Sequence, residues 1–424
     1  MTLTSQQYAN LTEHSYDRDG GMHQLVDKEV VLEGNTYRVL RFVDNPRTGY
    51  QGTIYQHVES GEVVVAHRGT EFERQRWHDL VKTDGAMVLA RVNLQADDAV
   101  TLTRLARDYA SSPSNVAQYG GPSQVTVTGH SLGGTLAQIS AHHYGLRGET
   151  FNAYGAVSLD RRISTGGDRV LNHVMAADTV SSASRHYGQV RIYALAGEID
   201  MLRAAGYANN DARLLDPRAS LLAGIKGFSS HDMHLFLNVD GDKRTDRSVL
   251  DDPQTRRLAR EYAPMIGKYR DDVEGMRAAV TIAARGPYGT LRDGVDALRG
   301  PLLPGELGAR EDRARQMETL QAWGTFAAHA RAGDRNREGR ADGTESSTMF
   351  HAPLRLDARS PATEVGRLLS SAGVNDAEGM NAAMLDLQTS SYGREWKRQL
   401  EHHQQRINEL VPRTESHAPA EHAR

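Results

Sequence analysis

The amino-acid sequence predicts an α/β protein with a mostly parallel central sheet, followed by a mostly helical C-terminal region. Strand-like and helix-like segments alternate between residues 28 and 194. Within this stretch, a β-branched strand at 125–128 leads through a glycine-rich turn into a helix. Strand patterns end near residue 246, and segments rich in arginine, glutamate and alanine follow. We therefore predict one domain at residues 1–245 and a helical accessory region at 246–424.

The elements of the first domain follow one another in a regular order. A polar helix is expected within residues 1–20, and an amphipathic helix at 96–110, where apolar residues recur at helical spacing. The strand at 125–128 and its helix, which reaches to about 145, come next. Short β-branched or alternating segments bounded by Gly, Asn and Pro turns predict the other strands. These are 30–32, 37–43, 53–57 and 62–66, read as antiparallel, and then 170–176 and 189–194.

The accessory region is predicted to be helical from residue 251 to about 410, with its clearest apolar periodicity over 254–284. The polar segment 331–349 predicts a loop, and 411–424 predicts a disordered tail. Three interpretations of this region stay open. It completes the core of the first domain, forms a helical cap, or binds a membrane, a chaperone or delivery machinery.

Composition and charge limit the classes of function. The net charge is −4 over 424 residues, and neither half is basic, so we expect no nucleic-acid partner. The chain has no cysteine, which removes disulfides and thiolate metal sites. The N-terminus lacks the pattern of a Sec signal, and no apolar run reaches the roughly 20 residues that span a bilayer. We expect a cytoplasmic protein in the producing cell that meets lipid only at a surface.

The strongest chemical signal is the run VTVTGHSLGGTLA at 125–137. A strand enters a G-H-S-L-G turn with Ser131 at its apex, and a helix leaves it, which is the nucleophile elbow of α/β-hydrolases. Gly129 and Gly133 have no Cβ, so the turn can be sharp and the neighbouring backbone segments can approach closely. The helix N-terminus favours the negative charge that develops during acyl transfer. The sequence therefore predicts an α/β-hydrolase, with an ordinary glycine-rich turn and a solvent-facing serine as the alternative.

A serine nucleophile needs a base and an acid, which follow it in α/β-hydrolases in the order Ser, Asp or Glu, His. Asp178 comes after the strand at 170–176, at the carboxyl end where such sheets place catalysis. Asp200 follows the next strand and is the competing acid.

Three histidines compete for the role of the base. His231 comes first after a loop and is our choice. His234 lies three residues on, and His186 follows Asp178 closely, so both stay as alternatives. The oxyanion hole is expected to use the backbone N–H of Leu132, with the N–H and hydroxyl of Thr70 after the strand at 63–66. Such chemistry needs no metal and no organic cofactor.

Six motifs in order carry a resemblance to a known family: VVVAHRGTE, RWHDL, VTVTGHSLGG, TFNAYGA, NHVMAADTVSSASRHYG and SHDMHLF. Over about residues 28–240 the chain resembles the class 3 lipases, which are fungal-lipase-like α/β-hydrolases. The resemblance implies that Ser131 is the nucleophile, Asp178 the acid and His231 the base, with Thr70 and Leu132 forming the oxyanion hole. It implies that His186 is a second, non-catalytic histidine, and that structural positions are occupied by Trp77, Asp79, Asn152 and Gly155.

Two features depart from the family pattern. His67 stands where the family carries Phe before Arg-Gly, beside the expected oxyanion turn. The expected lid segment, 83–93, is short and carries few apolar residues, so activation by a large lid at an interface is in doubt.

The resemblance implies hydrolysis of lipid carboxylic esters, at a membrane surface, through an acyl-serine. Arginine far outnumbers lysine, which is typical of GC-rich bacterial genomes. With the missing signal and the extra helical region, this favours a bacterial phospholipase A-type effector exported by a specialised secretion system. Delivery, chaperone or immunity proteins would bind through 246–424. A soluble short-chain carboxylesterase and a non-catalytic binding module are the alternatives, and the oligomeric state is left open.

Overall fold

The computed structural model describes residues 3–16, 21–69, 85–159, 161–208, 227–239, 245–278 and 299–315. The chain divides into two compact units, Met1–Asp334 and Arg335–Arg424, and every described residue belongs to the first. The polar loop predicted at 331–349 and the tail predicted at 411–424 lie outside the described residues. The domain boundary at residue 245 stays a prediction.

Eight strands form a single sheet, and their order in the sheet is their order along the chain. The first four strands pair antiparallel, and the fourth to the eighth pair parallel. Antiparallel hairpins thus open the sheet and parallel crossovers complete it, which confirms the predicted mostly parallel α/β architecture. The strands are β1 (Glu29–Leu32), β2 (Asn35–Asn45), β3 (Tyr50–His57), β4 (Val63–His67), β5 (Val125–His130), β6 (Arg147–Phe151), β7 (Gly166–Met175) and β8 (Tyr187–Tyr193).

A helix precedes the sheet within the predicted residues 1–20, and others connect the parallel strands. One of the connecting helices is longer than predicted. A capping box between Thr4 and Gln7 starts the first helix at Ser5. The helix predicted at 96–110 begins already at Gly85, so part of the expected lid segment is helical. The helices and short 3₁₀ turns are α1 (Ser5–His14), α2 (Met22–Leu25), α4 (Gly85–Ala110), α5 (Pro113–Tyr119), α6 (Leu132–Tyr144), η1 (Ala156–Ser158), α7 (Thr179–Ser182), α8 (Ala196–Ala204), η2 (Gly227–His231), η3 (Met233–Phe236) and α10 (Pro253–Glu261).

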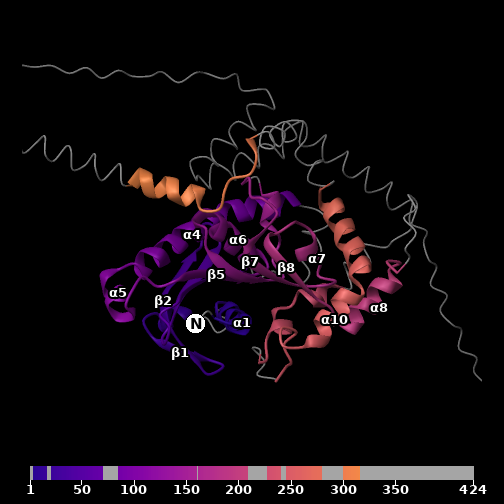
Figure 1. The fold of residues 1–424 in the computed structure, drawn as a ribbon, viewed down its shortest axis with the longest axis horizontal. Helices are drawn as coiled ribbons and strands as arrows, with labels where there is room; N and C mark the ends of the chain where they lie inside the picture. The colour runs from indigo at the N-terminus through magenta and orange to yellow at the C-terminus, as the bar shows by residue number, and fades with distance from the viewer. Residues whose placement is uncertain are drawn as a thin grey trace, which may run out of the picture. The chain divides into compact units, whose positions relative to one another are not determined.

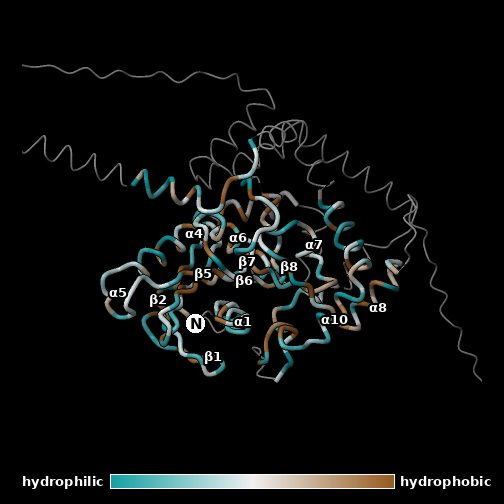
Figure 2. The backbone as a smooth tube through the Cα atoms, in the orientation of Figure 1, coloured by the Kyte–Doolittle hydropathy of each residue, from teal (hydrophilic) through white to brown (hydrophobic). Residues whose placement is uncertain are grey.

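The central strands are buried on both faces of the sheet. Successive residues of a strand point to opposite faces, and each face packs against helices. In β4, Val63 and Val65 lie in a core cluster that includes residues of α4 and α6. Val64 and Ala66 lie in a second cluster with residues of α1. Figure 1 shows α4 and α6 on one side of the sheet and α1 on the other. In Figure 2 the hydrophobic colour accordingly follows central strands such as β5.

Two described stretches of the predicted accessory region pack against the first domain. Residues 263–278 are helical, and Ile266 and Tyr269 are fully buried in the same core cluster as α4 and α6. Further along, the backbone N–H of Gly305 donates to the carbonyl of His142 in α6 at 2.7 Å. Of the three interpretations of this region, these contacts support completion of the core.

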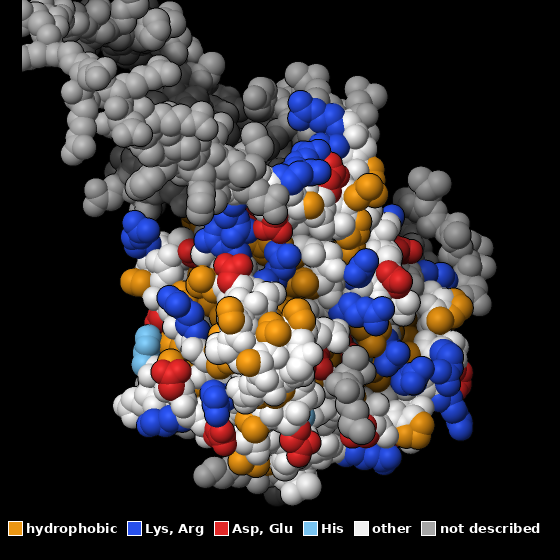
Figure 3. All heavy atoms as spheres, turned by 60° about the vertical axis from the view of Figure 1, so that its left-hand side comes forward, with side chains coloured by type: hydrophobic (Ala, Val, Ile, Leu, Met, Phe, Trp, Pro, Cys, Tyr) orange, Lys and Arg blue, Asp and Glu red, His pale blue; other side chains and the backbone are white. Residues whose placement is uncertain are grey.

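The surface carries mixed charge and apolar groups. On the face in Figure 3, hydrophobic side chains lie scattered between Lys or Arg and Asp or Glu side chains. None of the helices in the described stretches has both the length and the apolar character needed to cross a bilayer.

Candidate active site

The turn between β5 and α6 has the backbone of a nucleophile elbow. Ser131 has φ 58° and ψ −127°, a conformation that costs a non-glycine residue on the order of 1–3 kcal/mol. Glycine is required on both sides of it. A Cβ on Gly133 would stand 2.1 Å from the carbonyl oxygen of His67, and one on Gly129 would stand 2.5 Å from the Gly133 backbone. The sequence prediction of a sharp turn that needs two glycines agrees with this geometry.

Three residues predicted to act together lie within hydrogen-bond distance in the structure. The Oγ of Ser131 is 3.0 Å from Nε2 of His231, and Nδ1 of His231 is 3.0 Å from Oδ1 of Asp178. The three come from the β5–α6 turn, the end of η2 and the turn after β7. They are separated by up to 100 positions in sequence, and all three are buried. The hydroxyl can therefore donate to Nε2 while the Nδ1–H donates to the carboxylate.

The structure keeps Asp178 ionised. Burial on its own would raise the pKa of this carboxyl. The charge of His231 and the hydrogen bonds from His231 and Ser181 outweigh burial, so the pKa lies below its ordinary value. Asp178 also caps α7, because its Oδ1 accepts from the backbone N–H of Val180 at 3.1 Å and its Oδ2 from that of Ser181 at 2.9 Å. These bonds fix both the charge and the orientation of the carboxylate.

His130, the second residue of G-H-S-L-G, holds the segment that carries His231. Its Nε2–H donates to the backbone carbonyl of His231 at 2.8 Å, which leaves Nδ1 to accept from the hydroxyl of Tyr16 at 2.7 Å. The two imidazole rings lie 4.8 Å apart. Reasoning from the sequence did not assign this role to His130, because the motif fixes only its place in the turn and not its long-range partners.

The oxyanion site is described in part. Leu132 is the first residue of α6, where backbone N–H groups have no acceptor within the helix. Thr70, Trp77 and Asp79 lie outside the described residues. The chain just before Thr70 is close to the nucleophile, since a Cβ on Gly69 would stand 3.4 Å from Cβ of Ser131.

The alternative acid and bases have other surroundings. The side chain of Asp200 is 74% exposed and pairs with Arg203 on the same helix. His234 is 42% exposed, with Asp232 as its acidic neighbour at 3.9 Å. His186 is buried and donates from Nε2 to the carbonyl of Ala153 at 2.8 Å. Burial, assisted by the charge of Arg270, lowers the pKa of His186 to about 4.

Two buried polar side chains link the segments that carry Asp178 and His231. The Nδ2 of Asn152 donates to the carbonyl of Ser230 at 2.7 Å, and its Oδ1 accepts from the N–H of Met175 at 2.9 Å. Asn152 thus takes the structural position that the resemblance implies. Glu198 accepts from the N–H of Ala177 at 3.0 Å. No motif marked Glu198, because its role depends on a contact 21 residues away.

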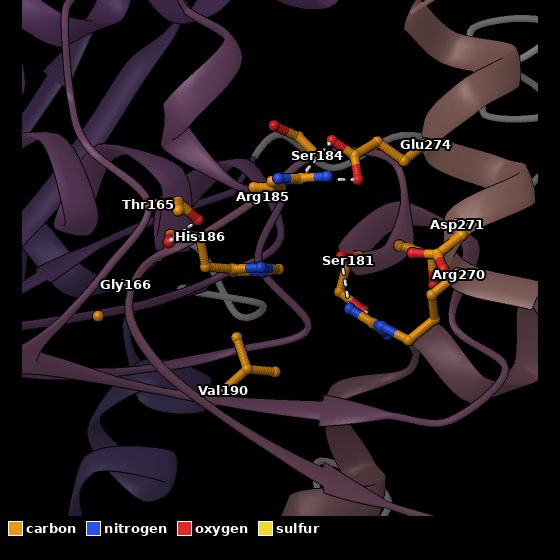
Figure 4. Close-up of a pocket in the computed structure, with 12 residues that line it drawn as sticks. Thr165, Gly166, Ser181, Ser184, Arg185, His186, Val190, Arg270, Asp271 and Glu274 are labelled. Atoms are coloured by element: carbon orange, nitrogen blue, oxygen red, sulfur yellow. Dashed lines mark hydrogen bonds and ion pairs between the residues drawn. The ribbon is translucent and has the colours of Figure 1, made fainter. Parts of the chain in front are cut away.

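A pocket of about 410 Å³ lies beside α7 (Figure 4). Its lining includes His186, Ser181, Arg270 and Glu274 but none of Ser131, Asp178 and His231. Arg270 donates to the carbonyl of Ser181 at 2.7 Å. This pocket is therefore separate from the candidate active site. In the described part of the chain, no three His, Asp or Glu side chains are arranged to hold a metal ion.

Comparison with solved structures finds lipases that align with part of the chain. The solved structures that align with the chain include Lip2 lipase from Yarrowia lipolytica, at 14% identity and a TM-score of 0.29 over 43% of this chain and 77% of that one. A lipase from Rhizopus microsporus var. chinensis aligns at 17% identity and a TM-score of 0.30, over 44% of this chain and 72% of that one. A triacylglycerol lipase from Penicillium expansum aligns at 16% identity and a TM-score of 0.29, over 46% of this chain and 82% of that one. A search of curated proteins found no significant match.

A family model matches a large part of the described domain. The model is that of the Tle-like phospholipase domain, and it covers residues 7–204, just under half of the chain. The matched segment contains Ser131 and Asp178, whereas His231 lies beyond its end. Over residues 7–204 the chain is similar to the Tle-like phospholipase domain, which confirms the expected lipase resemblance for this part.

Proposed function

We propose that the protein is a serine lipase or phospholipase that hydrolyses lipid carboxylic esters through an acyl-serine intermediate. The observation that carries the proposal is the hydrogen-bonded series Ser131, His231 and Asp178 at a strained strand-to-helix turn. Its support comes from the match of the surrounding segment to a phospholipase domain. Strain of this kind persists where the surrounding structure imposes it, as it does at many active sites.

The proposed reaction has two acyl-transfer steps. Nε2 of His231 takes the proton as Oγ of Ser131 attacks the ester carbonyl carbon, and Asp178 stabilises the resulting imidazolium. The N–H groups of Leu132 and Thr70 would stabilise the tetrahedral oxyanion, and each such donor typically contributes about 10²–10³ in turnover. The imidazolium then protonates the departing alcohol. Water, activated by the same base, attacks the acyl-serine and releases the fatty acid.

Phospholipid at a membrane surface is the substrate class that we propose. The family model is named for phospholipases, which favours this class over storage fat. We place the protein as a bacterial effector exported by a specialised secretion system, with delivery, chaperone or immunity partners bound through 246–424. Recovery of the protein from the producing cell only, under conditions in which that system is active, would contradict the export part of the proposal.

The test is release of free fatty acid from phospholipid vesicles, a triacylglycerol emulsion and a short-chain p-nitrophenyl ester. Wild type is compared with Ser131→Ala, and with Ser114→Ala on the surface of α5 as a matched control. We expect hydrolysis of vesicles by wild type and the control, and a loss of at least about 10³-fold in Ser131→Ala. Activity on the soluble ester alone would favour the carboxylesterase. Equal rates for wild type and Ser131→Ala on every substrate would favour the binding module.

A further inference from the structure

The acid and the base of the candidate site come from segments that are far apart in sequence. Asp178 follows β7, and His231 ends η2, 53 positions later. Their hydrogen bond of 3.0 Å therefore depends on how the two backbones are held against each other. A misplacement of about 1 Å in such a site can cost on the order of 10²-fold in rate. The residues just before each of them, Ala177 and Ser230, are the natural points of control.

One buried carboxylate reaches both of these points. Glu198 lies in the first turn of α8 and is 6% exposed. Its Oε1 accepts from the backbone N–H of Ala177 at 3.0 Å, and the side chain of Ser230 also hydrogen-bonds to it. Its Oε2 accepts from the N–H of Leu195 at 2.8 Å. Three donors from three segments thus converge on a single side chain.

Helix capping explains only part of this arrangement. The bond from Leu195 is the reciprocal contact of a capping box, which a solvent-exposed glutamate can make equally well. Glu198 is instead buried, and burial raises its pKa against the hydrogen bonds from Leu195, Ala177 and Ser230. The described residues provide no ion pair for it, and the charged groups that face it are Asp178 and Arg270. Burial of a carboxylate costs free energy, and a helix cap does not require it. Because Glu198 is buried, it reaches Ala177 and Ser230 as well as Leu195.

The carbonyl side of the same residue is also fixed. The hydroxyl of Tyr269, on the helix at 263–278, donates to the carbonyl of Ala177 at 3.1 Å. Ala177 is therefore held through its N–H by Glu198 and through its carbonyl by Tyr269. The two peptide units that flank the Cα of Ala177, immediately before Asp178, are thus each held by one hydrogen bond.

We propose that Glu198 is a positioning residue of the active site, which aligns the Asp178 turn with the His231 segment through Ala177 and Ser230. Glu198 touches neither substrate nor the reacting atoms. The inference rests on the proposed function, because it assigns to Glu198 the alignment of the acid and base of that reaction.

The test compares Glu198→Gln with Asp200→Asn, an exposed carboxylate on the same helix. The glutamine keeps the size of the side chain, but its NH₂ group donates and cannot accept, so the donors that meet both carboxylate oxygens can no longer all be satisfied. We expect kcat on the short-chain p-nitrophenyl ester to fall about 10- to 100-fold with little change in KM. The acidic limb of the kcat/KM profile should move to lower pH, because the protonated base loses part of the carboxylate contact that stabilises it. Asp200→Asn should match wild type in all three quantities.

Two further measurements separate positioning from stability. Ser230→Ala removes only one contact, and in a double-mutant cycle with Glu198→Gln its effect on kcat should be non-additive. In proton NMR, the downfield Nδ1–H resonance of His231, identified by its absence in His231→Gln, should weaken or shift in Glu198→Gln. A folded Glu198→Gln with wild-type kcat, pH profile and resonance would overturn the inference and leave Glu198 as a helix cap.

The proposed function and this inference fail in different ways. A wild type without Ser131-dependent hydrolysis contradicts the function, and the Nδ1–H resonance still decides whether Glu198 aligns the Asp178–His231 pair. An active wild type with an unchanged Glu198→Gln contradicts the inference alone. Should Glu198→Gln fail to fold, Ser230→Ala carries the test, and a wild-type kcat, pH profile and resonance in that variant would overturn the inference.

Discussion

At the scale of single residues, the second position of the G-H-S-L-G motif has a partner outside the elbow. His130 donates to the carbonyl of His231 and accepts from the hydroxyl of Tyr16, and all of these groups are buried. The backbone of the proposed base is thus tied directly to the turn that carries the proposed nucleophile. Removal of the His130 ring would leave the carbonyl and the hydroxyl without these contacts.

We therefore expect His130→Ala to lower both stability and turnover. Loss of a buried hydrogen-bond partner typically costs about 1–3 kcal/mol, which urea unfolding would measure. Because the His231 segment loses a constraint, kcat should fall about tenfold or more. His234→Ala is the matched control, and it also tests the alternative base. A His130→Ala variant with unchanged kcat, or a His234→Ala variant without activity, would contradict this assignment.

The residues of the candidate site differ in how far their roles can be predicted from the sequence. The elbow could be predicted, because strand, glycines and helix are adjacent in the chain and only glycine fits at position 133, where a Cβ would stand 2.1 Å from a carbonyl oxygen. The choice of His231 over His234 rested on its place directly after a loop and on the family resemblance. Tertiary contacts distinguish the two histidines in the structure: His231 hydrogen-bonds to Asp178, whereas the side chain of His234 is 42% exposed. Glu198 could not be predicted, since its partners are set by tertiary contacts.

At the scale of elements, the strands were easier to predict than the helix ends. Valine-rich segments at 62–66 and 125–128 signal central strands, because both of their faces are buried. The amphipathic pattern at 96–110 indicated only the second half of α4, which begins at Gly85. α5 is a short helix of seven residues with few apolar positions. Its start is defined by the Ser112 cap and Pro113 rather than by periodicity.

The helix at 263–278 permits a direct test of whether the accessory region completes the core. Ile266 is fully buried in the main core cluster, and Met276 on the same helix is 42% exposed. We expect Ile266→Ala to lower the free energy of unfolding by about 2–5 kcal/mol. Met276→Ala should change it by no more than about 0.5 kcal/mol. Thermal or urea unfolding measures both, and equal small effects would show that this helix is not part of the folding unit.

At the scale of the whole molecule, the site depends on more chain than the family match covers. The matched segment ends at residue 204, whereas His231 and the Tyr269 contact to Ala177 lie beyond it. The compact unit extends to Asp334. The sequence could predict a boundary near 246, because strand patterns stop there, but it could not show that the helix at 263–278 packs against α7 and the turn after β7.

Truncated chains would decide where the catalytic unit ends. A chain that stops at residue 245 retains Ser131, Asp178 and His231 but loses the buried Ile266 and Tyr269. A chain that stops at Asp334 retains the whole compact unit. We expect the longer chain to unfold cooperatively and to keep Ser131-dependent ester hydrolysis within about threefold of the full protein, since its core is intact. The shorter chain exposes apolar core surface and should be aggregated or inactive. Full activity and cooperative unfolding in the 1–245 chain would instead establish the boundary that the sequence predicts, and would make the contacts of residues 263–278 dispensable for the active site.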